Sequence, residues 1–236
     1  FLGNATSYTN IYYSYATGNV SGTSYVGGLV GGAFGAYNTI NYSFASGAVR
    51  GGAYVGGLVG QTGRTGSLIS DSYATGSVTG SNYVGGLVGQ SGTSNTNNVQ
   101  RSYATGLVQG SSNVGGFVGA ASQSVCLFGL AGCTNFWNTA STGQAVGIGG
   151  TANLTGAVGL TSSQLQSQVN FTSATVANGS INPNWNFSTP IWKMDPARNY
   201  GYPYLSWQNF VPVYIHRQCL DMECASHCHL QCGKLQ

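Results

Sequence analysis

The stretch SYATGSVTGSNYVGGLVG, at Ser72–Gly89, decides the fold because the chain contains four variants of it. The other copies begin at Ser14, Ser43 and Ser102, so the start-to-start spacings are 29, 29 and 30 residues. A fixed period of this length is typical of repeat proteins, in which each repeat packs mainly on its neighbours. The sequence therefore predicts one elongated repeat domain with further segments at its ends.

Composition and residue spacing favour strands over helices within each repeat. Charged residues make up only 5 % of the 236-residue chain, which contains 38 Gly and 15 Tyr. Each Gly inside a helix costs about 1 kcal/mol, whereas Ala16, Gly18 and Val20 alternate with the period of two that strands show. A β-residue advances about 3.3 Å, so one repeat has the length of one broad coil. The predicted fold class is all-β, a parallel β-solenoid (β-helix) of coils of about 29 residues.

Equivalent residues of neighbouring coils are expected to stack about 4.8 Å apart and to form ladders of like side chains. Three apolar ladders are predicted: Tyr15, Phe44, Tyr73 and Tyr103; Val26, Val55, Val84 and Val114; and Leu29, Leu58, Leu87 and Phe117. A fourth, hydroxyl ladder consists of Thr17, Ser46, Thr75 and Thr105, and hydrogen bonding along the ladder is its simplest interpretation.

The YVGGLVG half of the repeat carries apolar residues on both alternating faces, which predicts a strand covered on both sides. Its paired glycines favour a tight corner or a close approach between layers. The solenoid core covers one face, and the other requires a cover from this chain or from a neighbouring molecule. The second face is therefore predicted to be an assembly face, made of Tyr25, Leu29, Tyr54, Leu58, Tyr83, Leu87 and Phe117.

The chain divides into three predicted parts: solenoid repeats at residues 1–158, a capping segment at 159–210 and a Cys/His-rich tail at 211–236. Residues 120–158 are interpreted as a degenerate fifth coil. Residues 181–209 hold three of the four Trp and four of the five Pro, and are expected to cover the last coil, whose strand edges would otherwise be open. Thr161 is expected to cap a short helix at Ser162–Gln168.

Cysteines are the candidate covalent and metal-binding groups. Cys126 and Cys133 flank a short loop, and an oxidising compartment would allow a disulfide between them. The tail contains Cys219, Cys224, Cys228 and Cys232, for which disulfides within or between subunits are the favoured interpretation. A tetrahedral Zn²⁺ site that takes its four ligands from the same tail cysteines and His227 is the alternative, although the cysteine spacing does not form C-x2-C pairs.

The residues that enzymes need are sparse, so the sequence predicts no catalytic site and no cofactor. The four carboxylates are Asp71, Asp195, Asp221 and Glu223, and neighbouring coils supply no pair of the kind that glycosidases use. Asp71 is interpreted as a solvated loop residue. No G-x-S-x-G elbow and no phosphate loop followed by Lys-Ser/Thr is present. The net charge of +3 is too dispersed for nucleic-acid binding, and no apolar run is long enough to span a membrane.

The repeat SYATGxVxGxxYVGGLVG resembles the GLUG-motif repeats of bacterial surface proteins, including large adhesins. The resemblance covers roughly residues 11–209 and continues through Phe136-Trp137-Asn138, Gly159-Leu160-Thr161, Trp185–Phe187, Trp192 and Gly201–Leu205. It implies an extracellular or cell-surface protein that acts through its shape and surface.

We expect a secreted structural protein that self-associates into a homopolymer, as the subunit of a filament, sheath or matrix. The alternative is an adhesin fragment that binds glycans or host surfaces. A third class, polysaccharide-degrading β-helix enzymes, is disfavoured by the missing acids. The abrupt start at Phe1 and the composition are interpreted as those of a mature, processed extracellular form.

Overall fold

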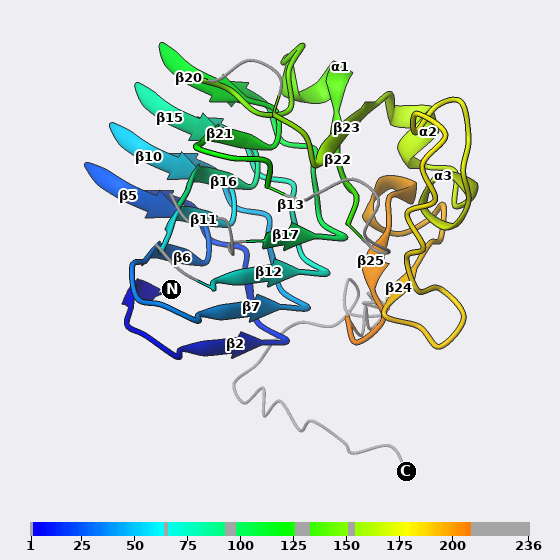
Figure 1. Ribbon diagram of the computed structural model, residues 1–236, viewed down its shortest axis with the longest axis horizontal. Helices are drawn as coiled ribbons and strands as arrows, with labels where there is room; N and C mark the ends of the chain where they lie inside the picture. The colour runs from blue at the N-terminus through cyan, green and yellow to red at the C-terminus, as the bar shows by residue number, and fades with distance from the viewer. Residues whose placement is uncertain (1, 64–65, 93–97, 126–132, 151–153, 209–236) are drawn as a thin grey trace, which may run out of the picture.

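A computed structural model describes residues 2–63, 66–92, 98–125, 133–150 and 154–208, and Figure 1 shows its parallel β-solenoid. Successive coils lie on top of one another, and the chain passes through short strands separated by corners. The predicted all-β solenoid with coils of about 29 residues is therefore confirmed.

Within the described ranges, five parallel sheets run along the solenoid, each built from equivalent strands of successive coils. The first contains β1 (Leu2–Ala5), β6 (Val30–Ala33), β11 (Val59–Thr62), β16 (Val88–Ser91) and β21 (Val118–Ala121). The second contains β5 (Ser24–Gly27), β10 (Ala53–Gly56), β15 (Asn82–Gly85) and β20 (Ser112–Gly115). The third contains β2 (Asn10–Tyr12), β7 (Thr39–Asn41), β12 (Leu68–Ser70) and β17 (Asn98–Gln100).

The two remaining parallel sheets are formed by the SYATGxV half of the repeat. One contains β3 (Tyr15–Ala16), β8 (Phe44–Ala45), β13 (Tyr73–Ala74), β18 (Tyr103–Ala104), β22 (Asn135–Asn138) and β23 (Ala157–Leu160). The other contains β4 (Val20–Ser21), β9 (Val49–Arg50), β14 (Val78–Thr79) and β19 (Val108–Gln109).

Register along the solenoid follows the repeat. Tyr73 lies opposite Phe44 and Tyr103 in the neighbouring coils, and the valine and leucine ladders continue in the same way. The aromatic rings of the first ladder stack with centroids 5.0–5.3 Å apart. All three predicted apolar ladders are therefore confirmed.

The YVGGLVG segment is bent, and the bend corrects the predicted assembly face. Tyr25 has a positive φ of 56° within β5, and the chain turns again between β5 and β6. A Cβ on Gly28 would lie 2.7 Å from the Cβ of Ala45 and even closer to the Gly57 carbonyl oxygen, so only Gly fits there. The strict alternation of faces therefore stops at Tyr25 and again at the glycine pair.

Both sides of this bent segment are covered by the same chain. One side packs into the main core, whose fully buried members include Leu29, Leu58, Leu87 and Phe117. These four residues cannot face a neighbouring molecule, so that part of the assembly-face prediction is wrong. The opposite side, represented by Val26, packs against the valines of the SYATGxV half in a second, smaller core. Tyr25 remains 39 % exposed and stacks on Tyr54, which in turn stacks on Tyr83.

The C-terminal segment contains short helices, a two-stranded sheet and loops, and lies beside the solenoid (Figure 1). Its elements are α2 (Ser162–Leu165), α3 (Val169–Thr172), β24 (Trp192–Lys193), the 3-10 helix η1 (Asn199–Gly201) and β25 (Tyr204–Leu205), while α1 (Thr139–Thr142) precedes it. Thr161 forms a capping box with Gln164, which confirms the predicted N-cap, although the helix ends at Leu165 rather than near Gln168.

The C-terminal segment was expected to cover the last coil of the solenoid. In the structure it covers a side of the solenoid instead. Its buried Trp185, Trp192 and Leu205 pack with Tyr73, Tyr103 and other members of a separate aromatic cluster. The physical reason is that the outward face of the SYATG aromatic ladder is itself apolar, and water would remain in contact with it if the segment lay only at the end.

Several predicted residues lie outside the described part of the chain. They are Cys126 and the whole tail at 211–236, including Cys219, Cys224, His227, Cys228 and Cys232. Cys133 is described: it is buried and disulfide-bonded, while its pairing with Cys126 stays a prediction. None of the helices in the described ranges has the length and apolar character of a membrane-spanning helix.

Candidate functional site

A groove of about 870 Å³ lies between the SYATG face of the solenoid and the C-terminal segment. This volume is within the range of roughly 300–1,000 Å³ that small-molecule pockets show. Aromatic, hydroxyl and amide side chains line it, and no charged side chain is among the described lining residues. They are Tyr15, Thr17, Phe44, Ser46, Tyr73, Thr75, Thr105, Ser141, Asn199, Tyr200, Tyr202, Trp207 and Gln208.

The floor of the groove consists of two neighbouring ladders of the repeat. Tyr15 lies in β3 and Thr17 directly follows that strand, so both side chains line the groove while Ala16 between them packs against the core. The same relation recurs in the next three coils. The aromatic ladder changes from 57 % exposed at Tyr15 to 2 % at Tyr73, because the C-terminal segment covers the later coils more fully than the first.

The wall of the groove is held against the floor by hydrogen bonds to the buried tyrosines. Tyr73 Oη lies 3.0 Å from Gln208 Oε1 and 2.8 Å from Gln208 Nε2. Tyr103 Oη donates to the Pro203 carbonyl oxygen at 2.6 Å and accepts from Asn199 Nδ2 at 2.8 Å. The wall is therefore fixed to two successive coils of the floor.

Trp207 extends the wall over the first two coils. Its indole Nε1 donates to the Tyr42 carbonyl oxygen at 3.0 Å. Its ring centroid lies 6.2 Å from that of Tyr15 and 6.0 Å from that of Phe44, with both pairs tilted. At this end the groove is bordered by aromatic side chains on both sides.

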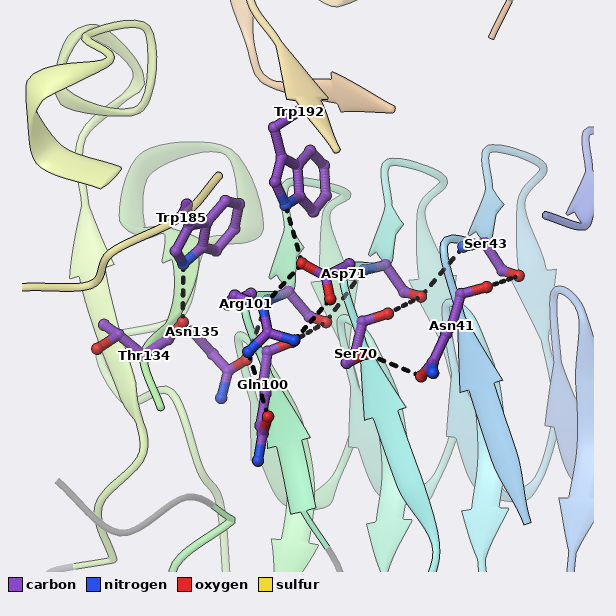
Figure 2. Close-up of polar contacts among 12 residues, drawn as sticks. Asn41, Ser43, Ser70, Asp71, Gln100, Arg101, Thr134, Asn135, Trp185 and Trp192 are labelled. Carbon is purple, nitrogen blue, oxygen red and sulfur yellow. Dashed lines mark hydrogen bonds and ion pairs between the residues drawn. The ribbon is translucent and has the colours of Figure 1, made fainter. Parts of the chain in front are cut away.

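A buried ion pair within the solenoid provides a further attachment point for the C-terminal segment that forms the groove wall (Figure 2). The side chain of Asp71 is fully buried, and Arg101 in the next coil donates to both of its carboxylate oxygens, at 2.8 and 2.7 Å. Trp192 Nε1 donates to Asp71 Oδ1 at 3.2 Å. The prediction that Asp71 is a solvated loop residue is wrong, because the C-terminal segment buries the corner on which it lies.

The corner residues themselves have left-handed backbone conformations. Tyr13, Tyr42, Asp71 and Arg101 each precede the Ser that opens a repeat, and their φ values are 49°, 53°, 49° and 44°. The first two rings stack with centroids 5.0 Å apart. At this position the first two coils thus carry an aromatic pair and the next two carry an ion pair. Alignment of the coils places Asp71 and Arg101 at equivalent positions, so their pairing could have been found from the sequence.

A column of serine hydroxyls explains why each repeat opens with Ser (Figure 2). Ser72 Oγ donates to the Ser70 carbonyl oxygen at 2.8 Å and accepts the backbone N–H of Ser43 at 3.2 Å. Ser102 continues the column, and the side chain of Asn135 ends it by accepting the Ser102 N–H at 3.1 Å. These hydroxyls satisfy backbone groups at a buried corner and are structural rather than part of the groove.

Burial raises the pKa of the two buried tyrosines of the aromatic ladder, Tyr73 and Tyr103. Desolvation is the largest cause for Tyr73 and for Tyr103, and the hydrogen bonds to Gln208 and Asn199 oppose it only in part. Both phenols therefore stay neutral over the physiological range. With no ionised group in its described lining, the groove presents ring faces and neutral hydrogen-bonding groups.

The sequence predicted the two ladders that form the floor, but not that they line a groove. The hydroxyl ladder of Thr17, Ser46, Thr75 and Thr105 had been assigned to internal hydrogen bonding, yet its side chains line the groove. The backbone N–H groups of this ladder do bond along the stack, as from Thr75 to the Ala45 carbonyl oxygen at 3.0 Å. A signal was present in the sequence, since hydroxyls two residues after an aromatic recur in all four copies.

Comparison with known proteins supports the repeat assignment. The family model described as "The GLUG motif" matches residues 51–79, which span one coil, and the resemblance to GLUG repeats is thereby confirmed. No curated protein matches the chain. Among solved structures, "a putative immunoglobulin A1 protease from Bacteroides ovatus" is similar, with a TM-score of 0.49 and 20 % sequence identity. The match covers 82 % of this chain and 56 % of that one; a likeness of this size says nothing about activity.

Proposed function

We propose that this chain with GLUG repeats is a non-catalytic binding module of the adhesin type, and that its groove holds a neutral glycan. The observation that carries the proposal is the groove lining, in which aromatic side chains alternate with hydroxyls and amides and no described residue is charged. A sugar ring presents C–H groups on its faces and hydroxyls at its edge. It therefore complements aromatic faces bordered by neutral donors and acceptors.

Other ligand classes fit this lining less well. A nucleic acid or a phosphorylated ligand would need Lys, Arg or backbone N–H groups directed at phosphate, and an anionic polysaccharide would need cations as well. A purely apolar ligand would leave the Thr and Ser hydroxyls of the floor without partners when it displaced their water, which costs free energy. A neutral polyhydroxylated ligand avoids both penalties.

The solenoid supplies a rigid floor for such a site. The floor aromatics belong to strands of one continuous sheet, in which the strand of Tyr73 is paired on both sides, and the wall is hydrogen-bonded to two coils of that sheet. A site whose groups are fixed before binding loses little conformational entropy when a ligand binds. An extracellular or surface location would suit this role and is part of the proposal.

The observation that favoured the filament hypothesis no longer supports it. It rested on a strand with an uncovered apolar face, and the leucines and valines on both faces of that strand are buried by the same chain, while Tyr25, Tyr54 and Tyr83 stay partly exposed. What remains are the tail cysteines, which lie outside the described residues. Covalent self-association stays a prediction, and non-reducing electrophoresis that shows only monomers would contradict it.

A glycan array with neutral and anionic members tests the proposed function. Wild-type protein is expected to bind neutral oligosaccharides, and Tyr15→Ala is expected to weaken that binding. Tyr25→Ala is the matched control, because Tyr25 is also the first, partly exposed ring of a stacked ladder but lies outside the groove. Binding confined to anionic members, no binding at all, or equal effects of the two substitutions would contradict the proposal.

A further inference from the structure

The groove is open at one end and closed at the other. Thr17 and Ser46 at the first two coils are exposed, whereas Thr105 in the fourth coil is only 8 % exposed. Beyond Thr105 the hydroxyl ladder ends against α1, where Ser141 Oγ donates to the Thr105 carbonyl oxygen at 2.6 Å. A chain that follows the ladder from Thr17 toward Thr105 therefore meets a barrier at α1.

Tyr200 belongs to the part of the wall fixed at this closed end. Its neighbour Asn199 donates to the hydroxyl of Tyr103, in the same coil as Thr105. Tyr200 lines the groove although its residue is 85 % exposed. It therefore contributes little to the packing of the protein itself.

The backbone around Tyr200 is held in an unfavourable conformation. Asn199, Tyr200 and Gly201 have successive φ values of 45°, 55° and 78°. A left-handed conformation costs roughly 1–3 kcal/mol at a non-Gly residue. Gln166 Nε2 supports the turn by donating to the Tyr200 carbonyl oxygen at 2.8 Å. The chain thus maintains a strained turn whose result is an exposed aromatic ring at the closed end.

We infer that the groove binds the end of a linear neutral glycan, with the terminal sugar at the closed end and its ring against Tyr200. The inference rests on the proposed function and adds to it the part of the glycan that is recognised. The hydroxyls of Thr75, Thr105 and Ser141 provide donors and acceptors for the terminal sugar. The rest of the glycan leaves along the floor past Tyr15, where the groove is open.

Binding stoichiometry distinguishes recognition of an end from recognition of internal sugars. The probes are maltohexaose, isomaltohexaose and mannohexaose with the corresponding soluble polymers amylose, dextran and mannan, titrated by calorimetry against wild-type protein. We expect one protein per chain for a hexasaccharide and for its unbranched polymer alike. Many proteins per unbranched polymer chain would overturn end recognition and leave the proposed function standing. If the protein bound none of these probes and no neutral member of the array, both end recognition and the proposed function would be overturned.

Substitutions at Tyr200 test its role separately. Tyr200→Ala is expected to bind the hexasaccharide about three- to tenfold more weakly, since one aromatic contact contributes about 0.5–1.5 kcal/mol, and Tyr200→Phe is expected to retain most of the affinity. Tyr8→Ala is the matched control, because Tyr8 is 71 % exposed, has a φ of 60° and lies outside the groove. Equal affinity of wild type and Tyr200→Ala, with unchanged melting temperatures, would overturn the assignment of Tyr200.

Discussion

Trp192 donates its indole N–H to the carboxylate of Asp71 at 3.2 Å, across 121 residues of sequence. Asp71 is fully buried and is held in place by two hydrogen bonds from Arg101. This corner of the solenoid is therefore one of the points at which the C-terminal segment that forms the groove wall is attached. The stability of that corner is coupled to the shape of the candidate site.

Removal of the Asp71 carboxylate is expected to destabilise the protein strongly. Asp71→Ala removes the carboxylate that Arg101 and Trp192 hydrogen-bond to at this corner, and losing one member of a buried pair costs about 3–5 kcal/mol. Urea denaturation measures the loss. Asp195→Ala is the control, because Asp195 pairs with Arg198 at 3.4 Å with both side chains more than a third exposed, and such pairs contribute roughly 0–1 kcal/mol. Similar losses for the two variants would contradict the role given to Asp71.

A methyl group at the corner glycine should prevent the coils from stacking. In Gly57→Ala the new Cβ would lie 2.8 Å from the Cβ of Ala74 and closer still to the Gly86 carbonyl oxygen. The clash involves backbone, so the expected loss is about 3 kcal/mol or more in free energy of unfolding. Gly18→Ala serves as the control, since nothing lies within 4 Å of its added Cβ, and should change stability by less than about 1 kcal/mol. A Gly57→Ala protein that melts like the wild type would refute the close approach.

Stability is expected to fall as the pH rises above about 10. Burial raises the pKa of Tyr73 and of Tyr103 in the folded protein, whereas an unfolded tyrosine ionises near pH 10. Above that pH the unfolded chain releases protons that the folded chain retains, so each tyrosine removes about 1.4 kcal/mol per pH unit. Below about pH 10 both forms are protonated and the contribution is fully present.

Chemical denaturation at several pH values between 8 and 12 measures this dependence. The double variant Tyr73→Phe/Tyr103→Phe should show a shallower decline, even though loss of the hydrogen bonds to Gln208 and Pro203 lowers its stability at pH 8. An unchanged slope in the double variant would show that other groups cause the alkaline loss.

The disulfide of Cys133 should join it to Cys126 and stabilise the fifth coil. A bridge over a loop this short contributes about 2.5 kcal/mol through restriction of the unfolded chain. Peptide mapping without reductant is expected to find these two cysteines linked, and Cys126→Ser to lower the melting temperature. A bridge from Cys133 to a tail cysteine would instead contradict the pairing and would tie the tail to the solenoid.

The ladders were predictable because they depend on the repeat alone. Parallel in-register pairing places each residue opposite its equivalent one period away, so Tyr73 had to meet Phe44 and Tyr103. The capping box at Thr161 was predictable for a similar reason, since its partner Gln164 is three residues away. In both cases the interacting groups are related by a fixed sequence interval.

The bend at Tyr25 was not predictable from the alternation of residue types. A positive φ at a tyrosine is uncommon. The tight corner was instead expected at the neighbouring pair of glycines. Gly28 does meet a close approach from the neighbouring coil, but the left-handed residue is Tyr25. Because the alternation of faces resets at such a bend, Leu29 lies in the core and not on the surface.

The sequence by itself determined the period, the strand content and the residues that stack on one another. Only the tertiary structure decided which faces of the coils are covered, where Asp71 lies and that a groove exists. The physical reason is that stacking follows an interval of 29 or 30 residues, whereas covering a face requires contacts such as that between Trp192 and Asp71, 121 residues apart. No local pattern encodes a contact over that separation, so the groove between solenoid and C-terminal segment appears only in the folded chain.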